Sequence, residues 1–265
     1  MPPVALVGNL SYDLVDGGAP RIGGAPIHCG RALRLLDARA TIVARCADDD
    51  MSDFRRGFAE LGVPARLLSG TTTTTFAFTY DGDTRTGEIE RIGEAWAVED
   101  VHSLPAGAWV HVGALLRGDF PAPVVAALAR GRRISFDAQG LTRVRELGPL
   151  RLEGERDNSI LRHVSILKLA VEEAEALVGR VSPHALARLG PPEVVVTYGS
   201  EGSLVIDRGR ATEVRARHVD ADPTGSGDAF AISYLVGRSR GHSPVASARR
   251  ASAVVADMLR ARIAK

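Results

Sequence analysis

The stretch Asp222–Phe230, DPTGSGDAF, places one acid between a loop of small residues and an apolar run. Gly225 and Gly227 permit backbone angles and close approaches that other residues resist. The run that follows, AFAISYLVG, is helical in character, and a helix N-terminus carries unpaired N–H groups and a partial positive charge. The loop therefore predicts an anion site built from backbone, and phosphate is the anion that suits it best.

Asp228 falls in the first turn of this expected helix, beside the predicted anion. A carboxylate there would not attract phosphate, but it could accept the proton of a hydroxyl that attacks the phosphate. Phosphoryl transfer requires this pairing of a preorganised cradle and a base. Alternatively, Asp228 only stabilises the helix N-terminus, where acids are common. The spacing alone leaves both interpretations open.

Motifs of other phosphate-binding and hydrolytic proteins are missing from the sequence. It has no GxxxxGK[ST], no GxSxG and no HExxH, which argues against P-loop proteins, serine hydrolases and zinc proteases. GSGDAF is not GxGxxG either, because Phe230 takes the third glycine position.

The composition is that of an ordinary globular protein. The 265 residues are 45% hydrophobic and 25% charged, with a formal net charge of +1, so neither nucleic acid nor an acidic membrane is expected as a partner. Cys29 and Cys46 are expected to be reduced thiols. The start of the chain lacks signal-peptide features, and no apolar run approaches the ~20 residues of a membrane helix. We therefore expect a cytoplasmic location.

Short β-branched runs alternate with longer amphipathic segments. The expected strands are Val4–Gly8, Ala40–Cys46, Trp109–Leu115, Arg133–Ala138, Val164–Leu169 and Glu193–Gly199. The expected helices are Pro26–Leu36, Phe54–Gly62, Pro121–Gly131, Glu172–Gly179, Pro183–Gly190 and Ala248–Lys265. This alternation predicts an α/β fold with a mostly parallel sheet, whose ligands bind beyond the carboxyl ends of the strands.

Two segments break the alternation. Thr71–Ile92 has threonines, alternating aromatics and a DGD turn, which predicts a hairpin that either extends the sheet or forms a flap near a site. Gly202–Ala216 predicts a second hairpin, turned at DRGR. No repeat or linker is visible, so residues 1–265 are expected to form one domain.

Asp222–Asp228 resembles the C-terminal signature of the ribokinase-like, or PfkB, family of carbohydrate kinases, D-x-T-G-x-G-D, at every fixed position. The likeness continues in family order over the chain. Similar segments are the Gly-Gly motif in Gly23–Leu33, the first strand in Val7–Asp13, the loop Cys46–Asp50, the magnesium-motif segment Lys168–Gly179 and the nucleotide-side hairpin Val196–Asp207.

The resemblance implies a ribokinase-like three-layer sandwich with a β lid, and it implies roles for individual residues. Asp228 would be the catalytic base, and the backbone N–H groups of Gly225, Ser226 and Gly227 would form the anion hole. Glu173 would serve Mg²⁺. The nucleotide would lie beside Lys168, Thr197 and Gly199, and the phosphate acceptor would face Asp13, Gly24 and His28.

Several features depart from the family pattern. Ala170 replaces the asparagine of N-x-x-E, which puts the magnesium assignment in doubt, although Glu172 or Glu175 could supplement Glu173. His28 stands where asparagine is usual, so the acceptor need not be ribose; a structural role for His28 is the alternative. The span Asp13–Gly23 is short, so the lid is expected to be reduced mainly to the 71–92 hairpin.

The segment Phe136–Arg143 follows an expected central strand and should reach the rim of the site. Asp137, Gln139 and Arg143 are candidates for acceptor contacts, with an ordinary loop role as the alternative.

Together these observations predict a kinase that transfers the γ-phosphate of Mg-ATP to a hydroxyl of a sugar or a polyol such as an inositol. A nucleoside kinase is the first alternative, because Phe76, Phe78 and Tyr80 could form a wall for a base. The second is a non-catalytic binding protein that kept the fold, which Ala170 favours and the complete DPTGSGD motif opposes. The resemblance leaves a homodimer open.

Overall fold

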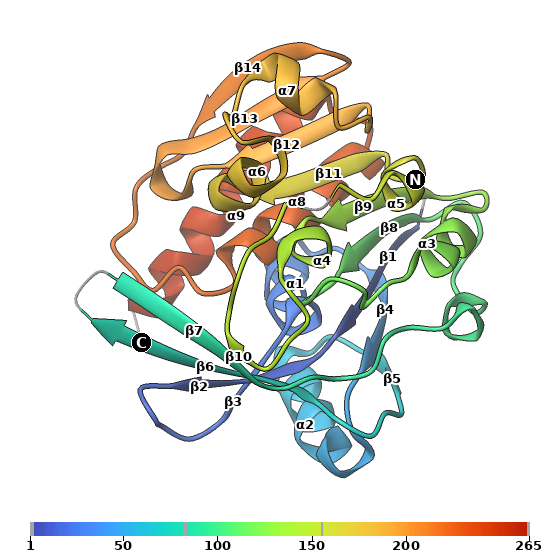
Figure 1. Cartoon of the computed structure of the whole chain (residues 1–265), viewed down its shortest axis with the longest axis vertical. Coiled ribbons are helices and arrows are strands. Elements are labelled where there is room, and N and C mark those ends of the chain that lie inside the picture. The colour runs from blue at the N-terminus through green and yellow to red at the C-terminus, as the bar shows by residue number, and fades with distance from the viewer. Residues whose placement is uncertain (1–2, 82–83, 155, 264–265) are drawn as a thin grey trace.

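The computed structural model describes residues 3–81, 84–154 and 156–263. Its largest element is a nine-stranded central sheet. The strands follow the order β14-β13-β12-β11-β9-β8-β1-β4-β5 (Figure 1). Their bounds are β1 (Val4–Asn9), β4 (Ala40–Arg45), β5 (Ala65–Leu68), β8 (Trp109–Gly113), β9 (Arg133–Asp137), β11 (Ile166–Ala170), β12 (Glu193–Thr197), β13 (Gly202–Asp207) and β14 (Arg210–Arg215).

The sheet is parallel from β5 to β12, and β13 runs antiparallel to both of its neighbours, β12 and β14. Strands buried on both faces need continuous apolar sequence, and β1 is buried at each of its positions. The chain leaves β1 first toward β4 and later returns to its other side at β8. Such a reversal opens a crevice beyond the carboxyl ends of the strands.

Helices cover both faces of this sheet (Figure 1). One layer holds α1 (Ala25–Leu35), α2 (Met51–Leu61), α8 (Ser226–Ser239) and α9 (Pro244–Ile263), whose apolar side chains share one buried cluster. The other holds α3 (Ala122–Ala129), α4 (Gln139–Thr142), α5 (Asn158–Leu161), α6 (Val171–Val178) and α7 (Pro183–Ala187). Short 3-10 turns occur at Asp48–Asp50, Val98–Val101 and Gly199–Glu201.

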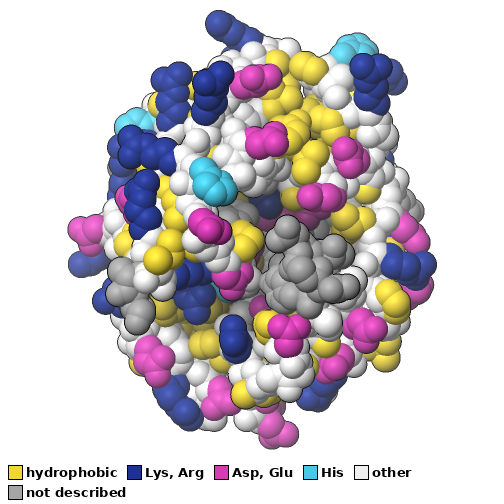
Figure 2. Space-filling model, turned by 90° about the vertical axis from the view of Figure 1, so that its left-hand side faces the viewer, with side chains coloured by type: hydrophobic (Ala, Val, Ile, Leu, Met, Phe, Trp, Pro, Cys, Tyr) yellow, Lys and Arg dark blue, Asp and Glu magenta, His cyan; other side chains and the backbone are white. Residues whose placement is uncertain are grey.

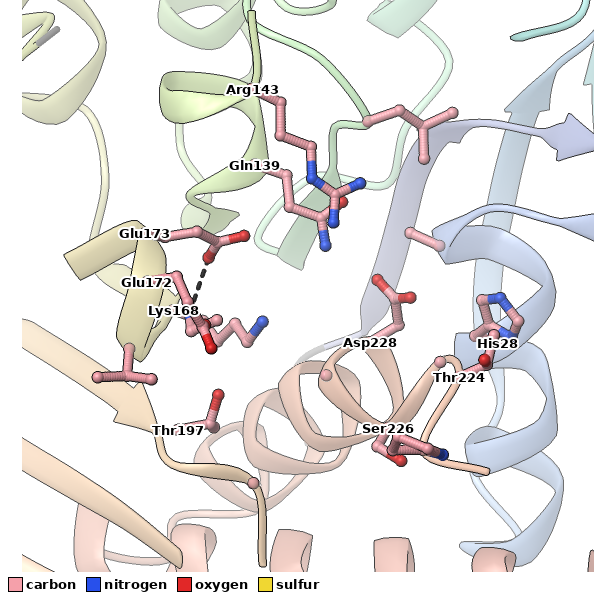
Figure 3. A pocket seen from close by; sticks show the side chains of 18 of the residues that line it. His28, Gln139, Arg143, Lys168, Glu172, Glu173, Thr197, Thr224, Ser226 and Asp228 are labelled. Carbon is pink, nitrogen blue, oxygen red and sulfur yellow. Dashed lines mark hydrogen bonds between the residues drawn. The ribbon is translucent and has the colours of Figure 1, made fainter. Parts of the chain in front are cut away.

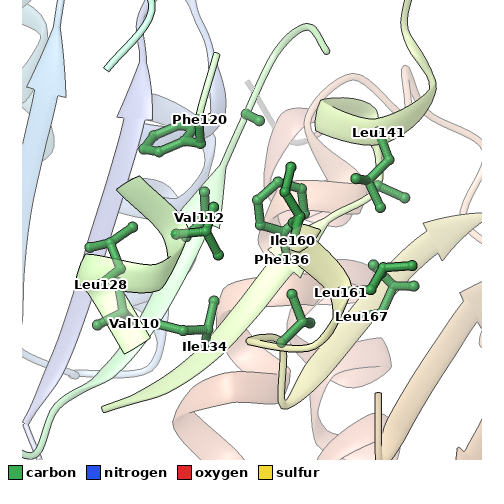
Figure 4. Packing of buried hydrophobic residues seen from close by; sticks show 14 of the residues in the cluster. Val110, Val112, Phe120, Leu128, Ile134, Phe136, Leu141, Ile160, Leu161 and Leu167 are labelled. Carbon is green, nitrogen blue, oxygen red and sulfur yellow. The ribbon is translucent and has the colours of Figure 1, made fainter. Parts of the chain in front are cut away.

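The apolar cluster between the sheet and the helix layer of α3 to α7 shows how strands and helices pack together (Figure 4). Phe136 of β9 and Leu167 of β11 are fully buried against Ile160 and Leu161 of α5. Burying a side chain of this size contributes about 1.5–3 kcal/mol relative to leaving it exposed. The packing therefore fixes the ends of β9 and β11, from which the site residues project.

A smaller sheet forms the lid, in the order β10-β7-β6-β2-β3. The hairpin of β6 (Thr74–Asp81) and β7 (Thr84–Arg91) was predicted, although its turn lies partly outside the described residues. We did not predict β2 (Ser11–Val15), β3 (Arg21–Gly23) or β10 (Gly148–Pro149). The lid thus extends beyond the 71–92 hairpin, because the short 13–23 span still supplies part of β2 and β3.

The α/β fold class and the mostly parallel central sheet are confirmed. Each predicted strand of this sheet is present to within a few residues at its ends, and so is each predicted helix. Residues 264–265, the end of the last predicted helix, lie outside the described residues. Organisation as one domain stays a prediction. None of the described helices combines the length and apolarity needed to cross a membrane.

Candidate active site

A cleft of about 640 Å³ lies where the lid faces the start of α8. The molecular face shown in Figure 2 is hollowed near its centre, with side chains of both charges around the hollow. Every predicted site residue except Asp137 lines the cleft. These residues are Asp13, Gly24, His28, Gln139, Arg143, Lys168, Glu173, Thr197, Gly199, Gly225, Ser226, Gly227 and Asp228.

The loop before α8 has the backbone shape that its glycines allow. Gly225 caps the helix with φ 75°, in the left-handed region that favours glycine. A Cβ atom there would lie 2.4 Å from the imidazole of His28, so the loop packs directly on α1. Among the described residues, the N–H groups of Gly225, Gly227 and Asp228 have no acceptor, whereas the N–H of Ser226 donates to the Pro223 carbonyl at 2.9 Å. The open N–H groups are those available to an anion.

Asp228 points from the first turn of α8 into the cleft, toward Gln139 and Arg143 (Figure 3). Its surroundings raise the pKa of its carboxyl to about 7, chiefly through burial and then through the charge of Asp137. Lys168 and Arg143 act in the opposite direction and favour the charged form. A carboxylate with a pKa near neutrality suits a general base.

Behind Asp228 lies a buried group of charges. The Lys168 ammonium is 3.3 Å from the Asp137 carboxylate, and both side chains are almost fully buried. Burial alone would lower the pKa of Lys168, but Asp137, Glu173 and Asp228 outweigh it and raise that pKa to about 12. Lys168 therefore stays charged, pairs with Asp137 and attracts the carboxyl groups of Glu173 and Asp228 electrostatically.

Asp137 corrects our expectation of an acceptor contact at the rim. It is the last residue of β9, its side chain is inaccessible, and its Oδ1 accepts the N–H of Gln139 at 3.2 Å. The side chain turns beneath the cleft toward Lys168, because two buried opposite charges must pair. Gln139 and Arg143, from α4 and its end, do reach the cleft.

Glu173 lies at the start of α6, where its Oε2 accepts the N–H of Ala170 at 2.8 Å. Burial raises the pKa of Glu173, an effect that Lys168 opposes. The exposed Glu172 also lines the cleft. No group of three or more metal-ligating side chains occurs among the residues described, so the protein offers one or two carboxylates rather than a closed cage.

The side of the cleft at which we predicted the phosphate acceptor is built on α1 and β2. Gly24 caps α1 with φ 88°, and a Cβ atom there would lie 2.6 Å from the Asn9 carbonyl oxygen. His28 is buried, and Arg31 donates to its Nδ1 at 3.3 Å. Because a guanidinium can only donate, this Nδ1 accepts and the proton of a neutral His28 lies on Nε2.

On the side at which we predicted the nucleotide, the Thr197 hydroxyl donates to the Leu169 carbonyl at 3.1 Å, and Gly199 has φ 55°. A second pocket, of about 350 Å³, adjoins the cleft here and shares Ser226 and Gly227 with it. Its far wall is mostly apolar and comes from α9 and the segment before Pro223.

Sequence reasoning missed some cleft residues. Ser11, whose hydroxyl donates to Asp13 at 3.0 Å, was missed because β2 was not predicted. Leu115, Tyr198 and Thr224 also line the cleft. Tyr198 and Thr224 lie directly beside predicted residues, so adjacency in sequence was the signal that could have found them.

Open backbone N–H groups at a helix start, a carboxyl group with a raised pKa beside them and a cleft under a β lid are the features expected of a small-molecule phosphotransferase. The model of the pfkB family of carbohydrate kinases matches residues 15–260. A relative from Mycobacterium tuberculosis named ATP-dependent 6-phosphofructokinase isozyme 2 is 28% identical, over 91% of this chain and 76% of its own.

Solved structures agree. A pyrophosphate-dependent kinase in the ribokinase family, complexed with a pyrophosphate analog and myo-inositol, superposes with a TM-score of 0.86 at 25% identity, over 97% of this chain and 95% of its own. Burkholderia thailandensis nucleoside kinase in complex with inosine has a TM-score of 0.74 at 19% identity, over 96% and 90% of the two chains, and shows the fold alone. This chain therefore belongs to the pfkB family of carbohydrate kinases, and it is a phosphotransferase that acts on an alcohol group.

Proposed function

We propose that the chain transfers the γ-phosphoryl group of ATP to a hydroxyl of a sugar or polyol, with Asp228 as the general base. The observation that carries this proposal is the position of Asp228, one residue after Gly227 and directed into the cleft (Figure 3). The open N–H groups of Gly225 and Gly227 would hold the transferred group, and the half-buried carboxylate would take the proton of the attacking hydroxyl. His28 Nε2–H would donate to a second hydroxyl of the acceptor.

Mg²⁺ fits the donor set that is present. This ion keeps several waters and is usually held by one or two carboxylates together with substrate phosphates. Glu173, fixed by Ala170 N–H, and the exposed Glu172 would hold it on the α6 side of the cleft. When bound, Mg²⁺ would neutralise charge on the phosphates.

The donor is ATP in this proposal, although the similar kinase with myo-inositol is named as pyrophosphate-dependent. The pocket of about 350 Å³ next to Ser226 and Gly227 supports a nucleotide, since its apolar wall suits a base and pyrophosphate would leave it empty. Ser252 of α9 lines this pocket, whereas the next residue, Ala253, is exposed and does not.

The donor can be tested by filling that pocket. We expect Ser252→Phe to raise the KM for ATP and Ala253→Phe to leave it unchanged. Turnover with pyrophosphate but not with ATP in the unaltered protein would contradict the ATP assignment.

The reaction itself is tested by ADP release from Mg-ATP with sugars, inositols and nucleosides as acceptors. We expect turnover that depends on a sugar or polyol and that falls by about 10²–10⁴-fold in Asp228→Asn, with ATP binding retained. Near-normal turnover in this variant would refute the role of Asp228.

A nucleoside is the second candidate acceptor, because an aromatic wall faces the cleft. Phe76 and Phe78 of β6 line it, with stacked rings whose centroids are 5.8 Å apart. The same panel separates the two candidates. A homodimer and a cytoplasmic location also stay predictions.

A further inference from the structure

A second hollow adjoins the acceptor side of the cleft and has arginines on its walls. Its volume is about 220 Å³, and it shares Asp13, His28 and Thr224 with the main cleft. The two spaces therefore adjoin at His28. A ligand that reaches His28 from the cleft could extend into the hollow.

Three guanidinium groups line this hollow: Arg21 from β3, Arg31 from α1 and Arg262 from α9. None of them pairs with a carboxylate in the part of the chain that the structure describes. Arg31 donates to His28, and Arg262 donates to two backbone carbonyl oxygens, at 2.7 Å and 2.8 Å. Each of these contacts uses a neutral acceptor, so the positive charges are not compensated by them.

The pKa of Arg31 also indicates uncompensated positive charge in the hollow. Burial lowers the pKa of its guanidinium, and the nearby charge of Arg262 lowers it further. Two like charges held together in a partly buried space are stabilised when an anion binds between them. Guanidinium groups also match the geometry of phosphate and carboxylate oxygens better than ammonium groups do.

Two acids, Asp13 and Asp222, also line the hollow, and each accepts hydrogen bonds within its own segment of the chain. Asp13 accepts a hydrogen bond from Ser11 within β2. Asp222 accepts the N–H and the hydroxyl of Thr224, at 2.9 Å and 2.6 Å, which shapes the loop before α8. The hollow is therefore lined by three guanidinium groups and two carboxyl groups, and the positive groups are in excess.

We propose that this hollow binds an oxyanion carried by the acceptor itself, foremost a phosphate monoester, whose hydroxyl lies at Asp228. The inference rests on the proposed function and narrows it to anionic sugars or polyols. Arg31 and Arg262 would contact the anion directly, and Arg21 would lie at the mouth. Because the two spaces adjoin at His28, one small molecule that extends past this side chain would reach both the base and the arginines.

The test compares matched acceptors, fructose with fructose 6-phosphate and myo-inositol with an inositol monophosphate. We expect a higher kcat/KM for the phosphorylated member of at least one pair. Arg31→Gln should lower the ratio of the two values by about 10- to 100-fold, the range of a charge-assisted hydrogen bond. Arg31→Gln also removes the contact between Arg31 and His28. Because His28 would contact both members of a pair, this indirect effect would lower both kcat/KM values equally and would not account for a change in their ratio.

Arg34→Gln is the matched control, since Arg34 lies on the exposed side of the same helix and lines neither space. It should leave the ratio unaltered. Equal kcat/KM values within both pairs, or a ratio insensitive to Arg31→Gln, would overturn the proposal.

Calorimetric binding of the same four compounds without a donor separates this inference from the proposed function. Tighter binding of the phosphorylated compounds that is lost in Arg31→Gln would support the anion site even if no phosphoryl transfer occurred. Binding of inorganic phosphate that depends on Arg31, without any preference for phosphorylated acceptors, would overturn the assignment to the acceptor.

Discussion

At the scale of single residues, the neighbours of Asp228 act on its carboxylate in opposite directions. Burial and Asp137 favour the protonated form, whereas Lys168 favours the charged form. Lys168 stands between these acids and keeps its own proton. Among the groups that favour the charged form of Asp228, Lys168 has the larger effect and Arg143 the smaller.

This balance predicts the pH dependence of turnover. A base with a pKa of about 7 must lose its proton to act, so kcat/KM should fall below about pH 7. Lys168→Met removes a charge that lowers the pKa of Asp228, so the acidic limb of the profile should move to higher pH. Lys168→Arg keeps the charge and should move the limb less. An unchanged midpoint in Lys168→Met would show that Lys168 does not tune the base.

Gly225 and Gly227 lie where the loop before α8 enters the helix, a stretch here called the anion loop, and they should differ in their tolerance of a side chain. Gly225→Ala requires a Cβ atom 2.4 Å from the His28 ring and a left-handed backbone, so it should disrupt both the loop and His28. Gly227→Ala would meet only the flexible end of Lys168, at 2.9 Å. We expect kcat to fall on the order of 10²-fold or more in Gly225→Ala and clearly less in Gly227→Ala. Steady-state kinetics with similar losses in both variants would contradict this ranking.

At the scale of elements, the sequence was most informative where local pattern and burial coincide. The edge strand β5 is only partly buried and was missed, but β1, β4, β8, β9, β11 and β12 were predicted because buried parallel strands are continuous apolar runs. β2 and β3 were not, because β2 is held by β6, about sixty residues further on, and nothing local signals that pairing. In the site, the glycines on either side of Ser226 were sufficient to predict the loop before Asp228. The inward orientation of Asp137 could not be predicted, because it depends on an ion pair with Lys168 of another strand.

One contact between elements bears directly on the anion loop. Arg262 of α9 donates to the carbonyl oxygens of Asp222 and Thr224, which lie in the three residues before Gly225. Arg262→Ala should loosen the loop and lower kcat by roughly tenfold, the effect of losing a charged hydrogen bond. Arg260→Ala, which removes an exposed ion pair with Asp257 on the same helix, should leave kcat unchanged. Equal kcat values in the two variants would show that the loop does not need this contact.

At the scale of the whole molecule, the site brings together buried charges that folding must take out of water. Burial raises the pKa of the carboxyl groups of Asp228 and Glu173. An acid with a higher pKa in the folded state holds its proton longer there than in the unfolded state. Stability is therefore lost as the pH rises, for Asp228 between its ordinary 3.8 and about 7.

Asp228→Asn should consequently stabilise the protein while it removes the activity. At pH 4 the folded Asp228 is protonated and resembles asparagine, so the two proteins should melt at nearly the same temperature. At pH 8 the charged form is costly, and the Tm of the variant should exceed that of the unaltered protein, as thermal melts without ligands at both pH values would show. Asp257→Asn, at an exposed position, should shift Tm little at either pH. A Tm difference for Asp228→Asn that is the same at pH 4 and pH 8 would mean that this carboxylate is not strained by its surroundings, and it would also remove the reason to expect a base with a pKa near neutrality.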